Sequence, residues 1–255
     1  MLFTNTAFIG VDPTALRKPF TYAALDRERR LIALGRGEMN ALLAFVGGQQ
    51  EAFVAVNAPS HPNKGLMERE DVRQRLLPPP RPGRWLDLRL AEYQLRRLRI
   101  GVTPTPARAD LCPQWMLRGF AFYRSLEKMG CQAYPARDAP HQWLEVHPHA
   151  SFCVLLGGRP FPKRTLEGRL QRQLALHEQG VVINDAMIFL EEITRFHLLR
   201  GNLPLEKVYA PDALDAIVAA YTAFLAAQHP GKVTLLGAVE EGQIVLPVAE
   251  LKARY

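Results

Sequence analysis

Residues 7–13 read Ala-Phe-Ile-Gly-Val-Asp-Pro, so an apolar run ends in the carboxylate of Asp12 and is closed by Pro13. A strand that buries Phe8, Ile9 and Val11 holds Asp12 at its end in one fixed direction. Proline cannot donate a backbone hydrogen bond, so the strand is predicted to stop or bend there. A carboxylate held at the edge of a sheet suits a metal or phosphate site, and it equally suits a turn cap.

The chain has 255 residues, of which 48% are hydrophobic and 22% are charged, as is ordinary for a soluble globular protein. We expect a single domain over residues 1–255. The three cysteines form no CxxC pair, so neither a disulfide framework nor a thiolate zinc site is indicated. No signal peptide and no uninterrupted apolar run long enough to span a bilayer is recognisable, which predicts a cytoplasmic protein without a membrane partner.

The formal net charge of +7 favours polyanions such as nucleic acid as partners. Much of the arginine lies in the middle of the chain, which predicts a basic face beside the site. A solvated helix surface explains the same pattern nearly as well. The arginines concerned are Arg69, Arg73, Arg75, Arg81, Arg84, Arg89, Arg96, Arg97 and Arg99.

The first 60 residues predict a mixed sheet. Residues 19–25 and 31–34 read as a second and a third strand joined by a hairpin. Residues 38–46 read as a helix, and the continuous apolar run at 52–56 reads as a fourth strand buried on both faces. A meander followed by a right-handed crossover places this strand parallel to the first, so Asp12 and Asn57 should lie side by side at one sheet edge.

Residues 60–140 predict a helical and Pro-rich insertion within this domain, on the site side of the sheet. Three consecutive prolines begin a loop at 78–83, and helical patterns cover 86–98 and 115–128.

The remaining chain predicts further helices that cover both faces of the sheet. The clearest helix signal covers residues 212–227, where Asp212 follows Pro211 as the expected N-cap and the apolar interior predicts burial against the sheet. The other predicted elements are a fifth strand at 142–146, a helical or extended segment at 150–156, helices at 166–178 and 186–199, and a hairpin formed by 234–239 and 243–247.

Three further carboxylates are candidates for a shared site with Asp12. Asp212 and Asp215 lie three residues apart and project from one face of the last helix, although capping and the helix dipole explain them about as well. Glu145 ends the fifth strand, just before two histidines that we expect at the surface. Carboxylates with few imidazoles suit Mg²⁺ or Mn²⁺, and no HExxH or CxxC pattern indicates zinc.

Four segments carry a resemblance to a known family. They are Phe-Ile-Gly-Val-Asp at 8–12, Val-Ala-Val-Asn-Ala-Pro at 54–59, Glu-Val-His-Pro at 145–148 and Asp-Ala-Leu-Asp-Ala at 212–216. In this order they resemble a family of uncharacterised domains that are predicted RNase H-like nucleases, and the likeness covers nearly the whole chain. The last helix is similar to that of Holliday-junction resolvases, in which an aspartate pair joins a first-strand aspartate around Mg²⁺.

The resemblance implies an α/β fold with an RNase H-like mixed sheet: a three-stranded meander, a helix, a parallel fourth strand and a fifth strand. It implies catalytic roles for Asp12, Glu145, Asp212 and Asp215, with Asp12, Glu145 and Asp215 as ligands of Mg²⁺ or Mn²⁺. This chain departs from the family at Asn57, where the pattern has Asp before Ala-Pro. An amide still offers a neutral oxygen but removes one negative charge from the metal site.

Three cations and one amide are candidate substrate contacts: Asn57, Lys64, Lys163 and Arg169. Each cation is also explained as an ordinary exposed loop residue.

Two functions compete on this sequence. The first is a metal-dependent nuclease that cuts DNA or RNA with metal-bound water as nucleophile. The second is a non-catalytic nucleic-acid-binding protein with a degraded site, which Asn57 favours. An actin-like kinase shares a first strand ending in Gly-x-Asp, but its duplicated domain and glycine-rich phosphate loops are missing here.

Overall fold

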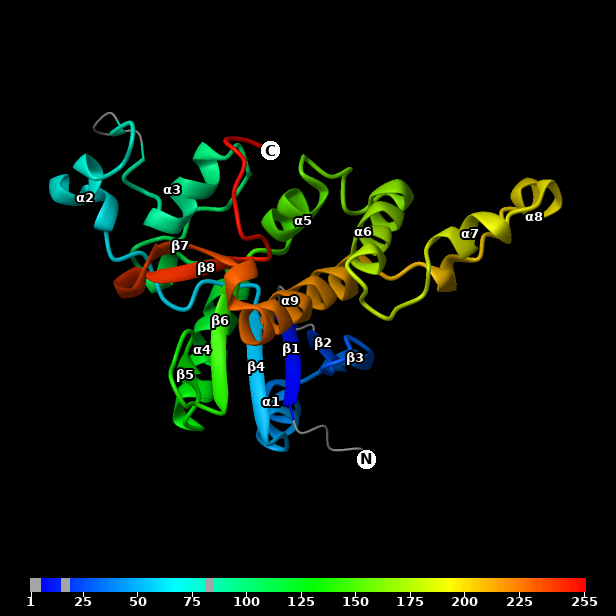
Figure 1. Ribbon diagram of the computed structural model, residues 1–255, viewed down its shortest axis with the longest axis horizontal. Coiled ribbons are helices and arrows are strands. Elements are labelled where there is room, and N and C mark those ends of the chain that lie inside the picture. Colours follow the sequence, from blue (N-terminus) through cyan, green and yellow to red (C-terminus); the bar gives the residue numbers. More distant parts are fainter. Residues whose placement is uncertain (1–5, 15–18, 81–84) are drawn as a thin grey trace.

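The computed structural model describes residues 6–14, 19–80 and 85–255. Its strands form one sheet in the order β3-β2-β1-β4-β6-β8-β7, with β5 pairing with β6 outside this path (Figure 1). The strands are β1 (Thr6–Asp12), β2 (Phe20–Leu25), β3 (Leu31–Gly37), β4 (Glu51–Val56), β5 (Gln132–Ala133), β6 (His141–Val146), β7 (Thr234–Ala238) and β8 (Gly242–Leu246).

The predicted meander and the parallel fourth strand are confirmed. β2 is antiparallel to β1 and to β3, whereas β4 is parallel to β1 and to β6. β3 continues three residues beyond the predicted end, to Gly37. The register pairs Val11 with Val56, and Val56 with Glu145. The carboxyl ends of β1, β4 and β6 therefore meet at one edge of the sheet.

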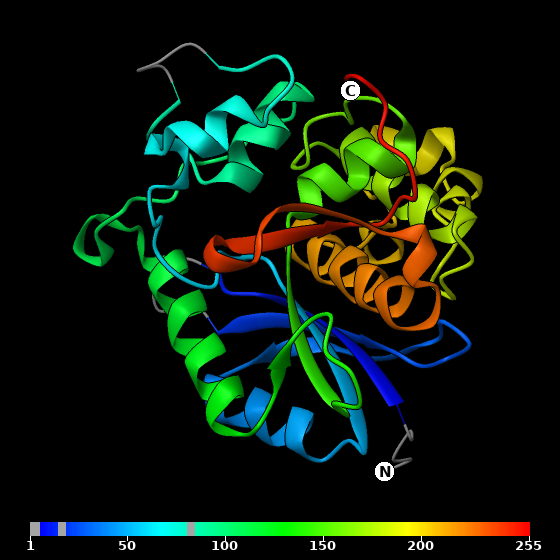
Figure 2. The ribbon, with the colours of Figure 1, turned by 60° about the vertical axis from the view of Figure 1, so that its left-hand side comes forward.

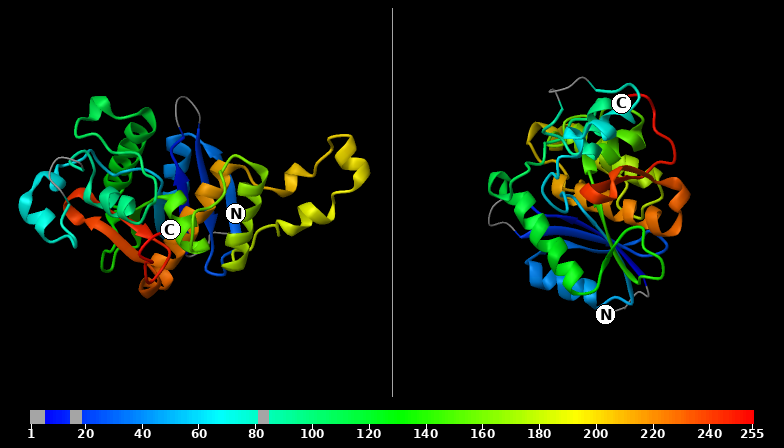
Figure 3. Two further views of the ribbon diagram at one scale, coloured as in Figure 1. Left: turned by 90° about the horizontal axis from the view of Figure 1, so that it is seen from above. Right: turned by 90° about the vertical axis from the view of Figure 1, so that its left-hand side faces the viewer.

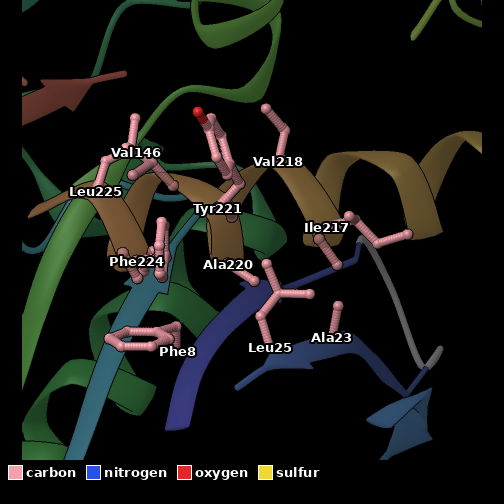
Figure 4. Packing of buried hydrophobic residues seen from close by; sticks show 14 of the residues in the cluster. Phe8, Ala23, Leu25, Val146, Ile217, Val218, Ala220, Tyr221, Phe224 and Leu225 are labelled. Atoms are coloured by element: carbon pink, nitrogen blue, oxygen red, sulfur yellow. The ribbon is translucent and has the colours of Figure 1, made fainter. Parts of the chain in front are cut away.

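The last long helix, α9 (Pro211–Gln228), crosses one face of this sheet (Figures 1 and 2). Phe8 and Leu25 point from the strands towards Ala220 and Phe224 of the helix (Figure 4), and the Phe8 and Phe224 rings meet edge to face with centroids 5.2 Å apart. The expected N-cap is wrong. Ala210 takes that position and Pro211 begins the helix, so the neighbouring aspartate lies inside the first turn without a capping bond.

Gly10 brings β1 and α9 together. A Cβ atom at this position would lie 1.9 Å from the backbone oxygen of Ala216 and 2.4 Å from the backbone nitrogen of Ala220. No side chain fits in that space. The helix backbone therefore rests directly on the strand, and the first turn of α9 is held beside the end of β1.

Helices cover the opposite face of the sheet as well, as predicted. Those helices are α1 (Met39–Gly47) and α4 (Gln114–Lys128), seen below and to the left of the sheet in Figure 2. Ile9 and Val11 point to this face, where Phe122 and Tyr123 of α4 join the same buried cluster. Part of the predicted insertion at 60–140 thus forms one of the two main packing layers.

The other helices lie around the site end of the sheet. α5 and α6 pack against α9, and α3 packs against β7. Their bounds are α2 (Glu70–Gln74), α3 (Leu90–Arg97), α5 (Pro148–Leu156), α6 (Leu166–Glu178), α7 (Met187–Glu191) and α8 (Arg195–Leu199).

The single helix predicted at 186–199 is wrong, because two short helices occupy this range. Thr194 interrupts the helix with extended backbone angles, and its hydroxyl accepts a hydrogen bond from the backbone N–H of His197, which starts α8. α7 and α8 form an arm that extends away from the body of the molecule (Figures 1 and 3).

The cysteines and the most apolar segment of the chain were also the subject of predictions. The three cysteines are buried and form no disulfide, as expected. One helical stretch, Leu205–Gln228, is long and apolar enough to cross a membrane by length and composition, although Asp212 and Asp215 interrupt its apolar sequence. Its most apolar window is 72% buried inside the protein, where it packs on the sheet.

Candidate functional site

The site begins at two strand ends. Side chains alternate between the two faces of a strand, so Asp12 shares the α9 face with Phe8, and Asn57 shares it with Ala55. The amide nitrogen of Asn57 lies 3.4 Å from Asp12 Oδ1. The predicted side-by-side placement of these two residues is therefore confirmed.

The first turn of α9 supplies the next two carboxylates. Asp215 is 4% exposed, and its Oδ2 accepts a hydrogen bond of 2.7 Å from the ammonium of Lys163. Asp212 keeps 40% of its side chain exposed and lies 4.0 Å from the guanidinium of Arg36 on β3. The structure thus brings Asp12, Asp212 and Asp215 together, and we call these three side chains the aspartate cluster.

The pKa values of two members of the aspartate cluster are raised. Burial raises the pKa of Asp12 to about 7, and the charges of Asp215 and Asp212 add to the increase. Lys163 and Asn57 oppose that increase. Burial also raises the pKa of Asp215, although the ammonium of Lys163 holds it back. A second cation at this position would therefore be stabilised by the cluster.

Glu145 does not join the aspartate cluster. Val146 faces α9 with the core residues, so alternation turns Glu145 to the opposite face of β6. Its carboxylate is fully buried and accepts hydrogen bonds from Arg89, at 2.9 Å between Nη1 and Oε2, and from the backbone N–H of Ser60. The spacing in the sequence placed this carboxylate at the correct sheet edge but on the wrong face.

Arg89 is the centre of a buried ionic network that the sequence did not reveal. Its guanidinium pairs with Glu145 and with Glu92, whose Oε1 lies 2.9 Å from Nε, and it donates to the backbone oxygen of Glu241. Burial lowers the pKa of Arg89, but the two carboxylates outweigh that effect and raise it. The buried carboxylate of Glu241 accepts from three backbone N–H groups, including that of Leu90. This network connects the 60–111 segment to the C-terminal end of β6 and to the residue that precedes β8.

His147, expected at the surface, is only partly exposed at the start of α5. Its Nδ1 accepts a hydrogen bond from the backbone N–H of Ala150, which leaves the ring proton on Nε2. Burial lowers the pKa of His147 to about 4, with His149 and nearby cations contributing. At neutral pH His147 is therefore an uncharged donor through Nε2.

Two cavities meet at the aspartate cluster. The first, of about 550 Å³, is lined by Asp12, Asp212, Trp115 and Glu145 among others, and we call it the carboxylate cavity. The second, of about 630 Å³, is lined by Arg172, Arg159, His149, Phe161 and Asp215 among others, and we call it the arginine cavity. Three side chains line both cavities: Asn57, His147 and Lys163.

Two predicted substrate contacts have other partners. Arg169 donates to the backbone oxygens of Val208 and Tyr209, and so ties α6 to the segment before α9. Lys64 is exposed and lines neither cavity, and its backbone N–H donates to Glu241.

The predicted basic face is only partly available. Arg89 is buried, Arg69 pairs with Asp71, and Arg73 donates to backbone oxygens. Arg81 and Arg84 lie outside the described residues.

Among the described side chains, no group of three or more His, Cys, Asp or Glu is arranged as a ready metal site. The position next to Asp215 is taken by the ammonium of Lys163.

A family model described as Protein of unknown function (DUF429) matches residues 10–241. No curated protein matches the chain, and no solved structure matches it. The matched span contains the whole aspartate cluster and the cavity-lining cations Lys163, Arg159 and Arg172.

Proposed function

We propose that this chain, which belongs to the DUF429 family of proteins of unknown function, is a metal-dependent nuclease that hydrolyses phosphodiester bonds in DNA or RNA. The observation that carries the proposal is the aspartate cluster. Residues 12, 212 and 215 are separated by about two hundred positions in the chain, yet they share one edge of the sheet beside a cavity of about 550 Å³. Asp215 is buried and the other two are partly exposed, and bringing such carboxylates together is costly unless a cation compensates them.

The donor set suits a hard divalent cation. Asp12, Asp212 and Asp215 would hold Mg²⁺ or Mn²⁺, and Asn57 would add a neutral oxygen if its amide turned. Lys163 shows that the cluster binds a positive charge, and a divalent cation would have to displace its ammonium from Asp215. A bound divalent cation would activate water and stabilise the leaving oxygen of a phosphodiester.

Two side chains at the rim suit the phosphate of the substrate. Lys163 reaches the cluster with an ammonium whose side chain is 45% exposed, so it can turn from Asp215 towards an incoming anion. His147 presents Nε2–H, a neutral donor for a phosphate oxygen. In the metal-free protein Asp12 has a pKa of about 7, so it is mostly ionised, and ready to bind a cation, only above neutral pH.

The arrangement of the sheet supports an RNase H-like reading of the fold. The chain begins with a β3-β2-β1 meander, crosses through α1 to a parallel β4, and continues to β6 on the far side of β4. An aspartate ends the first strand, and an aspartate pair begins the last helix, as the resemblance implies.

A non-catalytic nucleic-acid-binding protein is the second candidate. Three observations favour it: Lys163 neutralises Asp215, Arg89 removes Glu145 from the cluster, and Asn57 stands where the family pattern has a carboxylate. Each of them lowers the charge available to hold a cation.

The test is cleavage of labelled DNA and RNA, single-stranded, duplex and branched, with an excess of Mg²⁺ or Mn²⁺ or with EDTA. We expect cleavage that requires the cation and falls at least about 100-fold in Asp12→Asn and in Asp215→Asn. The matched control is Asp138→Asn, an exposed aspartate near the opposite end of β6.

The outcomes separate the two candidates. Binding that weakens as salt rises, without cleavage under any of these conditions, supports the non-catalytic candidate. Cleavage that persists in both cluster variants contradicts an active site at the aspartate cluster.

A further inference from the structure

The arginine cavity contains a buried guanidinium that forms no ion pair with a carboxylate among the described residues. Arg172 of α6 is 2% exposed, and within the described residues no carboxylate lies within ion-pairing distance of it. Both of the hydrogen bonds that it makes come from Nη1, which donates to the backbone oxygens of Phe161 and Gly168. Its remaining contact is with the face of Phe152.

The charge of Arg172 is only partly compensated by Asp215, which lies beyond ion-pairing distance, and this points to an anion. A buried guanidinium normally has a carboxylate beside it, as Arg89 does in the same molecule. Arg172 instead lines a cavity of about 630 Å³ together with Arg159 and Lys163. The carboxylate that lines this cavity, Asp215, is already paired with Lys163 at 2.7 Å.

The other groups that line the arginine cavity suit a phosphate that belongs to a nucleotide, with its base or sugar beside it. Both histidines of the wall have pKa values lowered by burial, and so contribute neutral ring N–H or N acceptors rather than charge. Phe161 is 56% exposed at the rim and lies between Pro160 and Pro162, which gives a flat apolar surface beside the cations. Aromatic surfaces of this kind stack on nucleobases.

We propose that the arginine cavity is an anion site, which holds a phosphate group of the nucleic acid strand next to the phosphodiester that lies at the aspartate cluster. Arg172 and Arg159 supply charge-assisted hydrogen bonds, and Phe161 contacts the adjoining base or sugar. The proposed nuclease function is needed only to identify the anion as part of a strand. The anion site itself stands on Arg172 and its cavity.

The test is isothermal titration calorimetry, which measures binding of inorganic phosphate, pyrophosphate and a short single-stranded oligonucleotide to the metal-free protein in EDTA. We expect pyrophosphate to bind and the oligonucleotide to compete with it. Arg159→Glu should weaken binding of both by about tenfold or more, because it replaces an attractive charge by a repulsive one. Arg137→Glu is the matched control: it is an exposed arginine before the start of β6, away from this cavity.

Arg172→Gln provides the second variant, checked for folding by its thermal transition because Arg172 also holds two backbone oxygens. A folded Arg172→Gln that binds pyrophosphate like the wild type overturns the proposal, as does equal binding by Arg159→Glu and Arg137→Glu. Pyrophosphate binding that the oligonucleotide does not displace overturns the assignment to a strand.

The nuclease proposal fails separately from this one. Loss of cleavage in Asp12→Asn bears on the aspartate cluster alone. Sensitivity of anion binding to Arg159→Glu, in a protein that cleaves nothing, would support the anion site and contradict the nuclease.

Discussion

At the scale of single residues, Asp12 links the site to folding stability. The folded chain binds a proton at Asp12 near pH 7, whereas the unfolded chain releases it near the ordinary pKa of 3.8. Between these values the folded state holds the extra proton, so the free energy of unfolding falls as the pH rises, by at most about 1.4 kcal/mol per pH unit. Above about pH 7 this loss is complete.

Asp12→Asn should remove that dependence. We expect the variant to gain stability relative to the wild type from pH 5 to pH 7, measured by urea unfolding in metal-free buffer. A stability difference that stays constant over this range would contradict the raised pKa of Asp12.

Glu145 gives a second prediction at this scale. Arg89→Met should destabilise the protein by about 3–5 kcal/mol, because it leaves Glu145 and Glu92 buried without a cation. Glu145→Gln should lower stability as well and leave Mn²⁺ affinity unchanged, whereas Asp215→Asn should weaken Mn²⁺ binding. Titration calorimetry and urea unfolding measure the two effects. Weaker Mn²⁺ binding in folded Glu145→Gln would restore Glu145 as a metal ligand.

The residues of the site were predictable only in part. Asp12, Asp212 and Asp215 were found because a strand end and a helix start are visible as local patterns. Lys163 was predicted as a candidate substrate contact, and its pairing with Asp215 was not. Arg172 was missed, and Arg89 was wrongly expected on a basic surface, because burial of an arginine depends on distant segments and leaves no mark in the nearby sequence. The face of Glu145 was missed because the alternation along the strand does not by itself tell which of its two faces meets α9, and Leu144 and Val146 take that face.

At the scale of elements, the contact between β1 and α9 sets the geometry of the site. Gly10→Ala should be strongly destabilising, by about 3 kcal/mol or more, because the new methyl group meets helix backbone rather than a flexible side chain. Gly101→Ala is the control, since a Cβ there has open space. Thermal unfolding measures both. Equal melting temperatures for the two variants would show that α9 shifts freely on the sheet.

Elements with a strong periodic signal were predicted well, and short ones were not. The helix at 166–178 has its predicted bounds, and α9 differs from its prediction by one residue at each end. The two-residue β5 carries no detectable pattern, and it exists because β6 offers a free edge. The break between α7 and α8 depends on one hydroxyl cap at Thr194, which competes with a helical pattern on both sides.

At the scale of the whole molecule, the arm is the part least supported by packing. Large apolar side chains on it are exposed, including Phe196 at 57% and Leu199 at 81%. We expect limited trypsin digestion to cut first after Arg195 or Arg200, as mass spectrometry of the fragments would show. First cuts within α6 or α9 would contradict this. A partner that covers the arm would slow these cuts.

Lys163 has one more consequence for the molecule as a whole. Its single ammonium lines both the carboxylate cavity and the arginine cavity, so it cannot pair with Asp215 and with an anion in the arginine cavity at the same time. An anion that draws Lys163 away from Asp215 would leave that carboxylate free to bind a divalent ion, and a divalent ion bound there would release Lys163 for the anion. By thermodynamic reciprocity each ligand would then increase the affinity for the other by the same factor. Sulfate should therefore tighten Mg²⁺ binding, and Lys163→Met should abolish that cooperativity.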